Sequence, residues 1–145
     1  MQTRSSAPPL AARLRIAVAR TARRLRQEAG GGLSPTLTAA LATIDRHGPL
    51  TPSELAARER IQRPTATRLV ATLEAQGLIA RTADPVDGRS FLISLTPEGK
   101  ALLHEVRTRK DAFLAQRLRK LSVEDRATLA RAAELLEDLL EDEPA

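Results

Sequence analysis

The sequence predicts a mainly α-helical protein with one small two-stranded β-hairpin, and two observations lead to this fold class. Ser or Thr stands before proline at 34–35, 51–52 and 96–97, which places a side-chain oxygen at a helix N-cap and proline in the first turn. Ser122 before Val123 marks a fourth helix start in the same way, without the proline. Residues 78–95 read instead as two strands, because two apolar runs there flank a turn of Asp, Pro and Gly at 84–88.

The first expected helix runs from Pro9 to Ala29, with leucine and valine at helical spacing between arginines, and it ends at the glycine triplet 30–32. The second runs from Pro35 to about Arg46 and is stopped by a Gly-Pro pair. Its apolar side includes Leu41 and Ile44. Both helices are therefore amphipathic.

A short third helix from Pro52, a turn at 59–61 and a fourth helix opened by Pro64 and closed by Gly77 form a helix-turn-helix. In the fourth helix Leu69, Val70 and Leu73 would dock on the domain. The polar residues at its start would enter a DNA major groove, where Thr meets a thymine methyl and Arg binds guanine. An ordinary polar helix face would give the same pattern. The candidate recognition residues are Gln62, Arg63, Pro64, Thr65, Thr67 and Arg68.

The hairpin follows the recognition-like helix directly, as the wing of a winged helix does. Arg89 would lie at its tip, placed to enter a minor groove whose negative potential attracts arginine. Asp87 would hold that arginine or cap the turn. The alternative is a solvated hairpin with one surface arginine. The candidate wing residues are Arg81, Asp87, Gly88 and Arg89.

Two more helices are expected after Thr96, the first marked by Leu102, Val106, Phe113 and Leu114. The apolar stripes of the first and last helices need a cover, and a second copy of the chain is the simplest one. The alternative is that they pack only on their own winged helix. The expected dimer residues are Leu14, Val18, Leu129, Leu136 and Leu140.

These elements divide the chain into an expected disordered N-terminus at 1–8, an N-terminal dimerisation helix at 9–32 and a winged helix-turn-helix DNA-binding lobe at 33–96. C-terminal dimerisation helices follow at 97–141, and then a tail at 142–145.

The amino-acid composition disfavours or excludes several classes of protein. The 145 residues include two Phe, no Trp and no Tyr, which disfavours modules that stack single-stranded bases on aromatic rings. Cys is absent, so disulfides and thiolate chemistry are excluded. No apolar run approaches the roughly 18 residues of a membrane span, and the N-terminus lacks the apolar segment of a secretory signal. A cytoplasmic protein is expected.

The distribution of charge along the chain indicates a polyanionic binding partner. Residues 1–81 hold thirteen Lys and Arg against five Asp and Glu, whereas residues 82–145 hold ten against thirteen. Twenty of the 23 basic residues are Arg, which suits bidentate contacts to phosphate and guanine. GC-rich codon usage would give the same arginine excess.

Catalysis has little support. The only histidines, His47 and His104, lie apart with no nucleophile or acidic constellation beside them, and no phosphate-binding glycine motif is present. We expect no enzyme activity, no metal site and no cofactor. The acidic residues from Glu137 onward are most simply a solvated helix end.

Five motifs together resemble the winged-helix core of MarR-family transcriptional regulators. They are L-T-x-x-E-L-A at Leu50–Ala56, P-x-x-T-R at Pro64–Arg68, L-E-x-x-G-L-I at Leu73–Ile79, D-P-x-D-x-R at Asp84–Arg89 and L-T-x-x-G at Leu95–Gly99. With the flanking helices the resemblance covers roughly residues 10–140.

The resemblance implies a homodimer that binds palindromic double-stranded DNA operators, often with a small anionic or phenolic effector. By position, Thr65, Thr67 and Arg68 match recognition-helix contacts, and Asp87 and Arg89 match the wing pair. Gln62 departs from the pattern, since a Ser or similar capping residue is usual there.

An effector would occupy a mainly aliphatic pocket between the second helix and the helix from Pro97, lined by Leu41, Ile44 and Phe113. The sequence thus predicts a dimeric, sequence-specific transcriptional regulator, and in particular a repressor that an effector releases. The alternative is a winged-helix module for protein interaction or DNA architecture, without operator specificity.

Overall fold

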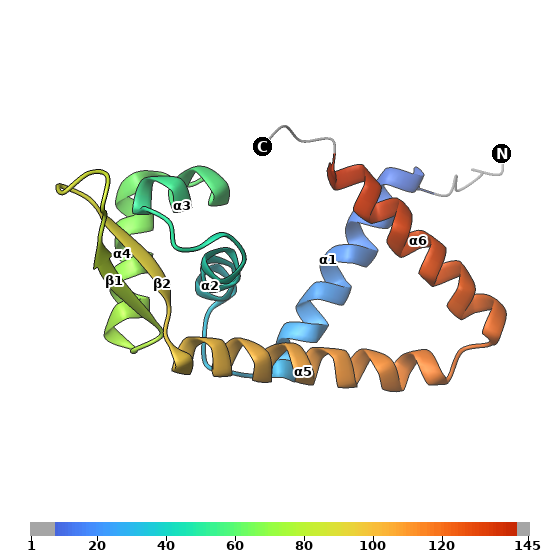
Figure 1. Cartoon of the computed structure of the whole chain (residues 1–145). Coiled ribbons are helices and arrows are strands. Elements are labelled where there is room, and N and C mark those ends of the chain that lie inside the picture. Colours follow the sequence, from blue (N-terminus) through green and yellow to red (C-terminus); the bar gives the residue numbers. More distant parts are fainter. Residues whose placement is uncertain (1–7, 142–145) are drawn as a thin grey trace, which may run out of the picture.

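The computed structural model describes residues 8–141 and contains six helices and a two-stranded antiparallel sheet (Figure 1). The mainly helical fold class with a small β-hairpin is confirmed. Apart from Pro8, the predicted disordered ends lie outside the described residues. The elements are α1 (Leu10–Ala29), α2 (Pro35–His47), α3 (Pro52–Glu59), α4 (Arg63–Ala75), β1 (Ile79–Ala83), β2 (Phe91–Leu95), α5 (Pro97–Arg119) and α6 (Val123–Glu141).

Side-chain caps start four of these helices where the sequence predicted them. In each case the hydroxyl oxygen accepts a hydrogen bond from the backbone N–H three residues later, which satisfies a donor that the helix itself leaves unpaired. The hydroxyls of Ser34, Thr51, Thr96 and Ser122 begin α2, α3, α5 and α6 in this way, over 3.1–3.2 Å.

The winged lobe is α2, α3, α4 and the hairpin packed around one core. Leu50 extends the sheet, because its N–H donates to the Ile93 carbonyl over 3.1 Å and its carbonyl accepts from the Ile93 N–H over 2.8 Å. The buried cluster includes Leu41, Ile44, Leu50, Leu55, Val70, Leu73, Ile79, Ile93 and Leu103.

The recognition helix docks through a slightly different face from the predicted one. Val70 and Leu73 are buried as expected, whereas Leu69 is only half-buried and packs at the edge of the core. Ala66 is fully buried instead. Residues 66, 70 and 73 share one side of a helix, and the small alanine lets the N-terminal end of α4 approach the lobe closely.

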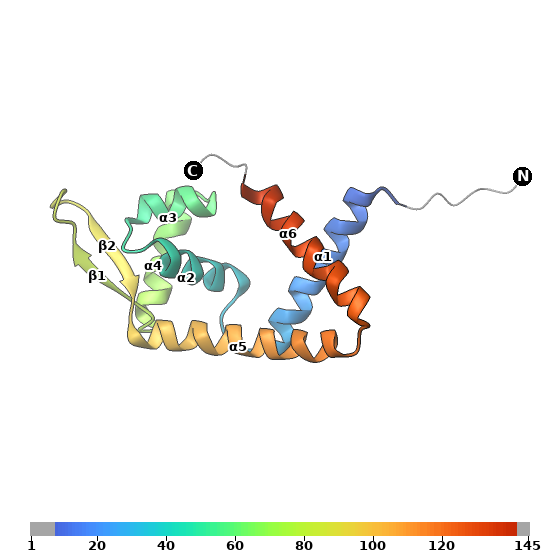
Figure 2. The same ribbon diagram turned by 45° about the vertical axis from the view of Figure 1, so that its right-hand side comes forward.

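Helix α5 connects the lobe to the rest of the molecule. Its first half packs against α2 and β2, and α1 meets it further along. In Figures 1 and 2 the lobe lies at one end of α5, α6 rises from the other end, and α1 meets α5 between them. Leu103 of α5 belongs to the buried core of the lobe, and Arg107 of α5 forms a partly exposed ion pair with Asp45 of α2 over 3.2 Å.

The apolar stripes predicted for a dimer are uncovered in the single chain. No residue of α6 is buried. Leu14 and Val18 on α1 are 39% and 49% exposed, and Leu129 and Leu140 on α6 are 47% and 77% exposed. Leu136 is partly buried. The alternative that α6 packs on its own winged helix is therefore wrong.

Candidate nucleic-acid interface

The turn between α3 and α4 is tight. Arg60 adopts a left-handed conformation (φ 53°, ψ 46°), and the Ile61 N–H donates to the Ala56 carbonyl over 3.0 Å. A left-handed residue at the end of a helix reverses the chain within a few residues. This conformation sets the angle at which α4 leaves α3 and presents its first turn.

The first turn of α4 is open to an anion. Gln62 stands at the N-cap, but its side chain makes no capping hydrogen bond, and Arg63 and Pro64 are exposed. Backbone N–H groups at a helix N-terminus attract phosphate. A shallow hollow here is lined by Arg60, Ile61, Gln62, Arg63 and Thr65.

The outward face of α4 carries the other predicted contacts. Thr67 and Arg68 are exposed, and Thr65 is half-buried. The Thr67 hydroxyl donates to the Arg63 carbonyl over 3.0 Å. Arg68 reaches the Thr65 hydroxyl at 3.5 Å, too long to hold the guanidinium firmly.

Two aspartates shape the tip of the wing. Asp84 Oδ1 accepts a hydrogen bond from the Val86 N–H over 2.9 Å, and Asp87 Oδ1 accepts one from the Arg89 N–H over 3.0 Å. Asp87 therefore caps the turn, as one of its two predicted roles required. Gly88 and Arg89 are exposed. Among residues 8–141 the Arg89 guanidinium has no ion-pair or hydrogen-bond partner.

Arg81, the other candidate wing arginine, is held within the molecule. Its Nε forms an ion pair with Glu74 of α4, and its guanidinium lies 4.2 Å from the centroid of the Phe91 ring. No role at this site was predicted from the sequence for Glu74 or Phe91. The only signal was that Glu74 belongs to the L-E-x-x-G-L-I motif.

A further basic group lies where α2 ends against α3. Arg58 Nη1 is 3.4 Å from His47 Nε2. Partial desolvation, and then the nearby charges of Arg58 and Arg46, lower the pKa of His47 below its usual value. At neutral pH the two arginines therefore supply the positive charge here, and the histidine is neutral.

The three predicted effector residues are not brought together. Leu41 and Ile44 belong to the core, each 1% exposed. Phe113 lies on α5 between two guanidinium groups, with Arg24 at 5.4 Å and Arg117 at 4.9 Å from its ring centroid.

The pocket between α1, α2 and α5 has other walls. It has a volume of about 370 Å³, and three cationic side chains, Arg23, Arg26 and Lys110, share it with Leu33, Thr38 and Val106. The lining is therefore mixed, with three basic side chains beside apolar ones, and it contains none of the three predicted residues.

Within residues 8–141, no three His, Asp or Glu side chains are grouped so that they would hold a metal ion. None of the helices in the same range is long and apolar enough to span a membrane.

Comparisons with known proteins agree with this geometry. Residues 33–91 match the MarR family. An HTH-type transcriptional regulator of Mycobacterium leprae is 37% identical over 136 residues, 93% of this chain and 95% of that protein. The HTH-type transcriptional repressor MdtR of Bacillus subtilis is 36% identical over 110 residues, 71% of each chain.

Solved structures show the same relationship. A transcriptional regulator from Pseudomonas aeruginosa superposes with a TM-score of 0.83 and 39% identity, covering 92% of this chain and 95% of that one. These relatives are regulators rather than enzymes, as the sequence predicted. The protein belongs to the MarR family of winged helix-turn-helix, DNA-binding transcriptional regulators.

Proposed function

We propose that the protein is a homodimeric repressor that binds a palindromic operator sequence-specifically. The observation that carries this proposal is the pairing of an exposed polar face on α4 with Arg89 at a capped wing tip, which has no side-chain partner among residues 8–141. A relative bearing 36% identity over 71% of the chain is named a repressor, which supports the direction of regulation.

The two surfaces have different roles in the proposed complex. Arg63, Thr65, Thr67 and Arg68 contact base edges or set the register in the major groove, with Gln62 and Pro64 at the entry of the helix. Arg89 reaches the adjacent minor groove and its phosphates, and Asp87 and Gly88 hold the turn that presents it.

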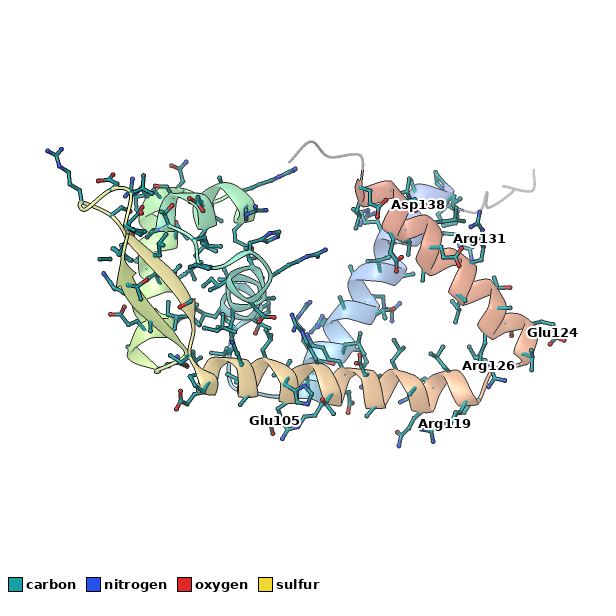
Figure 3. All side chains as sticks on the ribbon, in the orientation of Figure 1. Glu105, Arg119, Glu124, Arg126, Arg131 and Asp138 are labelled. Carbon is teal, nitrogen blue, oxygen red and sulfur yellow. The ribbon has the colours of Figure 1, made fainter. Side chains whose placement is uncertain are left out.

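A second copy supplies the cover that α1 and α6 lack. Besides their exposed leucines and valines, the two helices carry opposite charge. Residues 10–29 contain six Arg and one Glu, while residues 123–141 contain six Asp and Glu and two Arg. Figure 3 labels several of the charged side chains at this end of the molecule, including Arg119, Arg131 and Asp138. Because their apolar stripes are flanked by opposite charges, α6 of one copy would pack against α1 of another.

A small anion is the effector class that the pocket between α1, α2 and α5 favours. Arg23, Arg26 and Lys110 would neutralise a carboxylate, and Leu33 and Val106 would contact an apolar body. Because α2 belongs to the lobe and α1 to the proposed dimer, an occupant would bias the angle between them, and so release the operator.

Binding isotherms at several salt concentrations test the proposal, on a palindromic duplex taken from the DNA beside the gene and on a scrambled duplex of the same composition. We expect affinity for the palindrome to exceed affinity for the scrambled duplex by about 10³-fold or more at physiological salt. Equal affinity for both would favour an architectural module, since the phosphate contribution is independent of sequence.

A further inference from the structure

We propose that Arg81 is a positioning residue, which fixes the wing relative to the recognition helix so that Arg89 and α4 reach adjacent grooves together. This inference rests on the proposed DNA-binding function. The observation behind it is that the Arg81 side chain joins three elements: it is carried by β1, pairs with Glu74 on α4 and stacks on Phe91 of β2.

The strand register explains the stacking. Arg81 lies opposite Ile93, and Ala83 lies opposite Phe91, so Arg81 and Phe91 are diagonal neighbours on the same face of the hairpin. Ile93 on that face is fully buried. Arg81 and Phe91 therefore lie just outside the core, on the side of the hairpin that faces α4.

The position of Glu74 in α4 also favours the ion pair with Arg81. Glu74 is the penultimate residue of the helix, where the helix dipole disfavours a negative charge, and no basic residue of α4 lies in that turn. Arg81 supplies the compensating charge from outside the helix. The connection spans Gly77, where the chain turns from α4 into β1 with a φ of 73°.

Of the basic side chains, only arginine can pair with the Glu74 carboxylate and stack on the Phe91 ring at the same time. The planar guanidinium places an N–H edge toward the carboxylate while its face lies against the Phe91 ring. A lysine ammonium would satisfy the charge but would not fill the space between Glu74 and Phe91 in the same way. This distinguishes Arg81 from an arginine that serves as a mobile phosphate ligand.

The two wing arginines, Arg81 and Arg89, therefore differ in how readily they could contact a DNA phosphate. Arg89 has no partner among the described residues, whereas a phosphate contact by Arg81 would require the Glu74 pair to break. Loss of the pair leaves every DNA-contacting charge in place and changes only where the wing points. Affinity then falls without a change in the number of neutralised phosphates.

Glu74→Gln is the informative variant, because a positioning role and a direct contact predict opposite signs. Removing a carboxylate from a polyanion-binding lobe normally strengthens binding, and Glu54→Gln on the exposed surface of α3 is the matched control for that effect. We expect Glu74→Gln and Arg81→Ala to weaken operator binding by about five- to tenfold with an unchanged salt slope, and Arg81→Lys not to restore it.

The contrary result is also defined. If Arg81→Ala lowers the salt slope by about one unit per wing, and Glu74→Gln binds as tightly as the control or tighter, Arg81 is a phosphate ligand and the inference is overturned.

A measurement without DNA separates this inference from the proposed function. The chain has no Trp or Tyr, so Val86→Trp, at a wing-tip position that is 94% exposed, gives a single fluorophore per chain. We expect Glu74→Gln to add a fast, large-amplitude component to the time-resolved anisotropy of this tryptophan. An unchanged decay would overturn the positioning role. A changed decay in a protein that binds no operator would support the positioning role and reject the proposed function.

Discussion

Arg109 Nη1 lies 3.0 Å from the carbonyl oxygen of Ala29, the last residue of α1. The carbonyl groups at the end of a helix are unpaired and carry partial negative charge, so a guanidinium there is favourable. The same junction is sterically close, since a Cβ on Gly31 would come within 2.9 Å of Val106. Arg109 therefore helps to anchor α1 on α5, next to the pocket between α1, α2 and α5.

Arg109→Met should lower the free energy of unfolding by about 1 kcal/mol, because it removes a hydrogen bond and a favourable helix-end charge from a site that solvent still partly screens. Urea unfolding with an unchanged m-value would measure the loss. Lys100→Met removes a cation from the exposed start of the same helix and should change stability by less than about 0.5 kcal/mol. Equal losses would contradict the anchoring role.

Leu136→Glu should dissociate or unfold the proposed homodimer, because an unpaired charge in an apolar interface costs several kcal/mol in order of magnitude. Sedimentation velocity at micromolar concentration measures the mass directly. Leu136→Met keeps the volume and the apolar character and should remain dimeric. A stable monomer of the unsubstituted protein would reject the dimer itself.

Arg89→Ala should weaken binding to every duplex and lower the salt slope by about one unit for each wing in contact. Arg68→Ala, Thr65→Ala and Thr67→Ala should instead cost roughly 1–3 kcal/mol on the operator and much less on scrambled DNA. The two kinds of variant serve as controls for each other in the same isotherms. Unchanged affinities and slopes for Arg89→Ala would show that the wing makes no contact.

An aromatic carboxylate such as benzoate should stabilise the protein through the pocket between α1, α2 and α5. At about five times its Kd, a ligand adds about 1 kcal/mol, which raises the Tm by about 2–4 °C. Lys110→Met should reduce this shift, because Lys110 lines the pocket. Phenol, which lacks the carboxylate of benzoate, is the matched control ligand. No stabilisation by either compound, with operator binding unaffected, would argue against direct sensing.

Gly99→Ala should destabilise the junction between the hairpin and α5. A Cβ at this position would lie 2.1 Å from the backbone carbonyl oxygen of Leu78, so either the Leu78 backbone or the start of α5 must shift. We expect a loss of about 1–3 kcal/mol in thermal or urea unfolding. Gly88→Ala, where a Cβ meets nothing within 4 Å, should stay within about 0.5 kcal/mol of the original.

The helix N-caps and the wing turn could be predicted from the sequence, because each depends on a hydrogen bond between residues only a few positions apart. A Ser or Thr hydroxyl caps the N–H three residues later, so Ser34, Thr51, Thr96 and Ser122 marked the starts of four helices correctly. The wing turn follows the same logic, since Asp87 accepts a bond from the N–H two residues on. The order of elements, the hairpin and the exposed face of α4 therefore followed from the sequence alone.

Only the tertiary structure decided which distant residues meet. Phe113 lies seven residues beyond Val106 on a straight helix, a rise of about 10 Å, so it lies away from Leu41 and Ile44 and between Arg24 and Arg117 instead. Arg81 and Arg89 look alike in the sequence, but the strand register and the angle of α4 bring Glu74 and Phe91 to Arg81, whereas Arg89 has no side-chain partner in the part of the chain that the structure describes. Such pairings depend on how rigid elements pack, and the spacing of residues within any one element does not encode them.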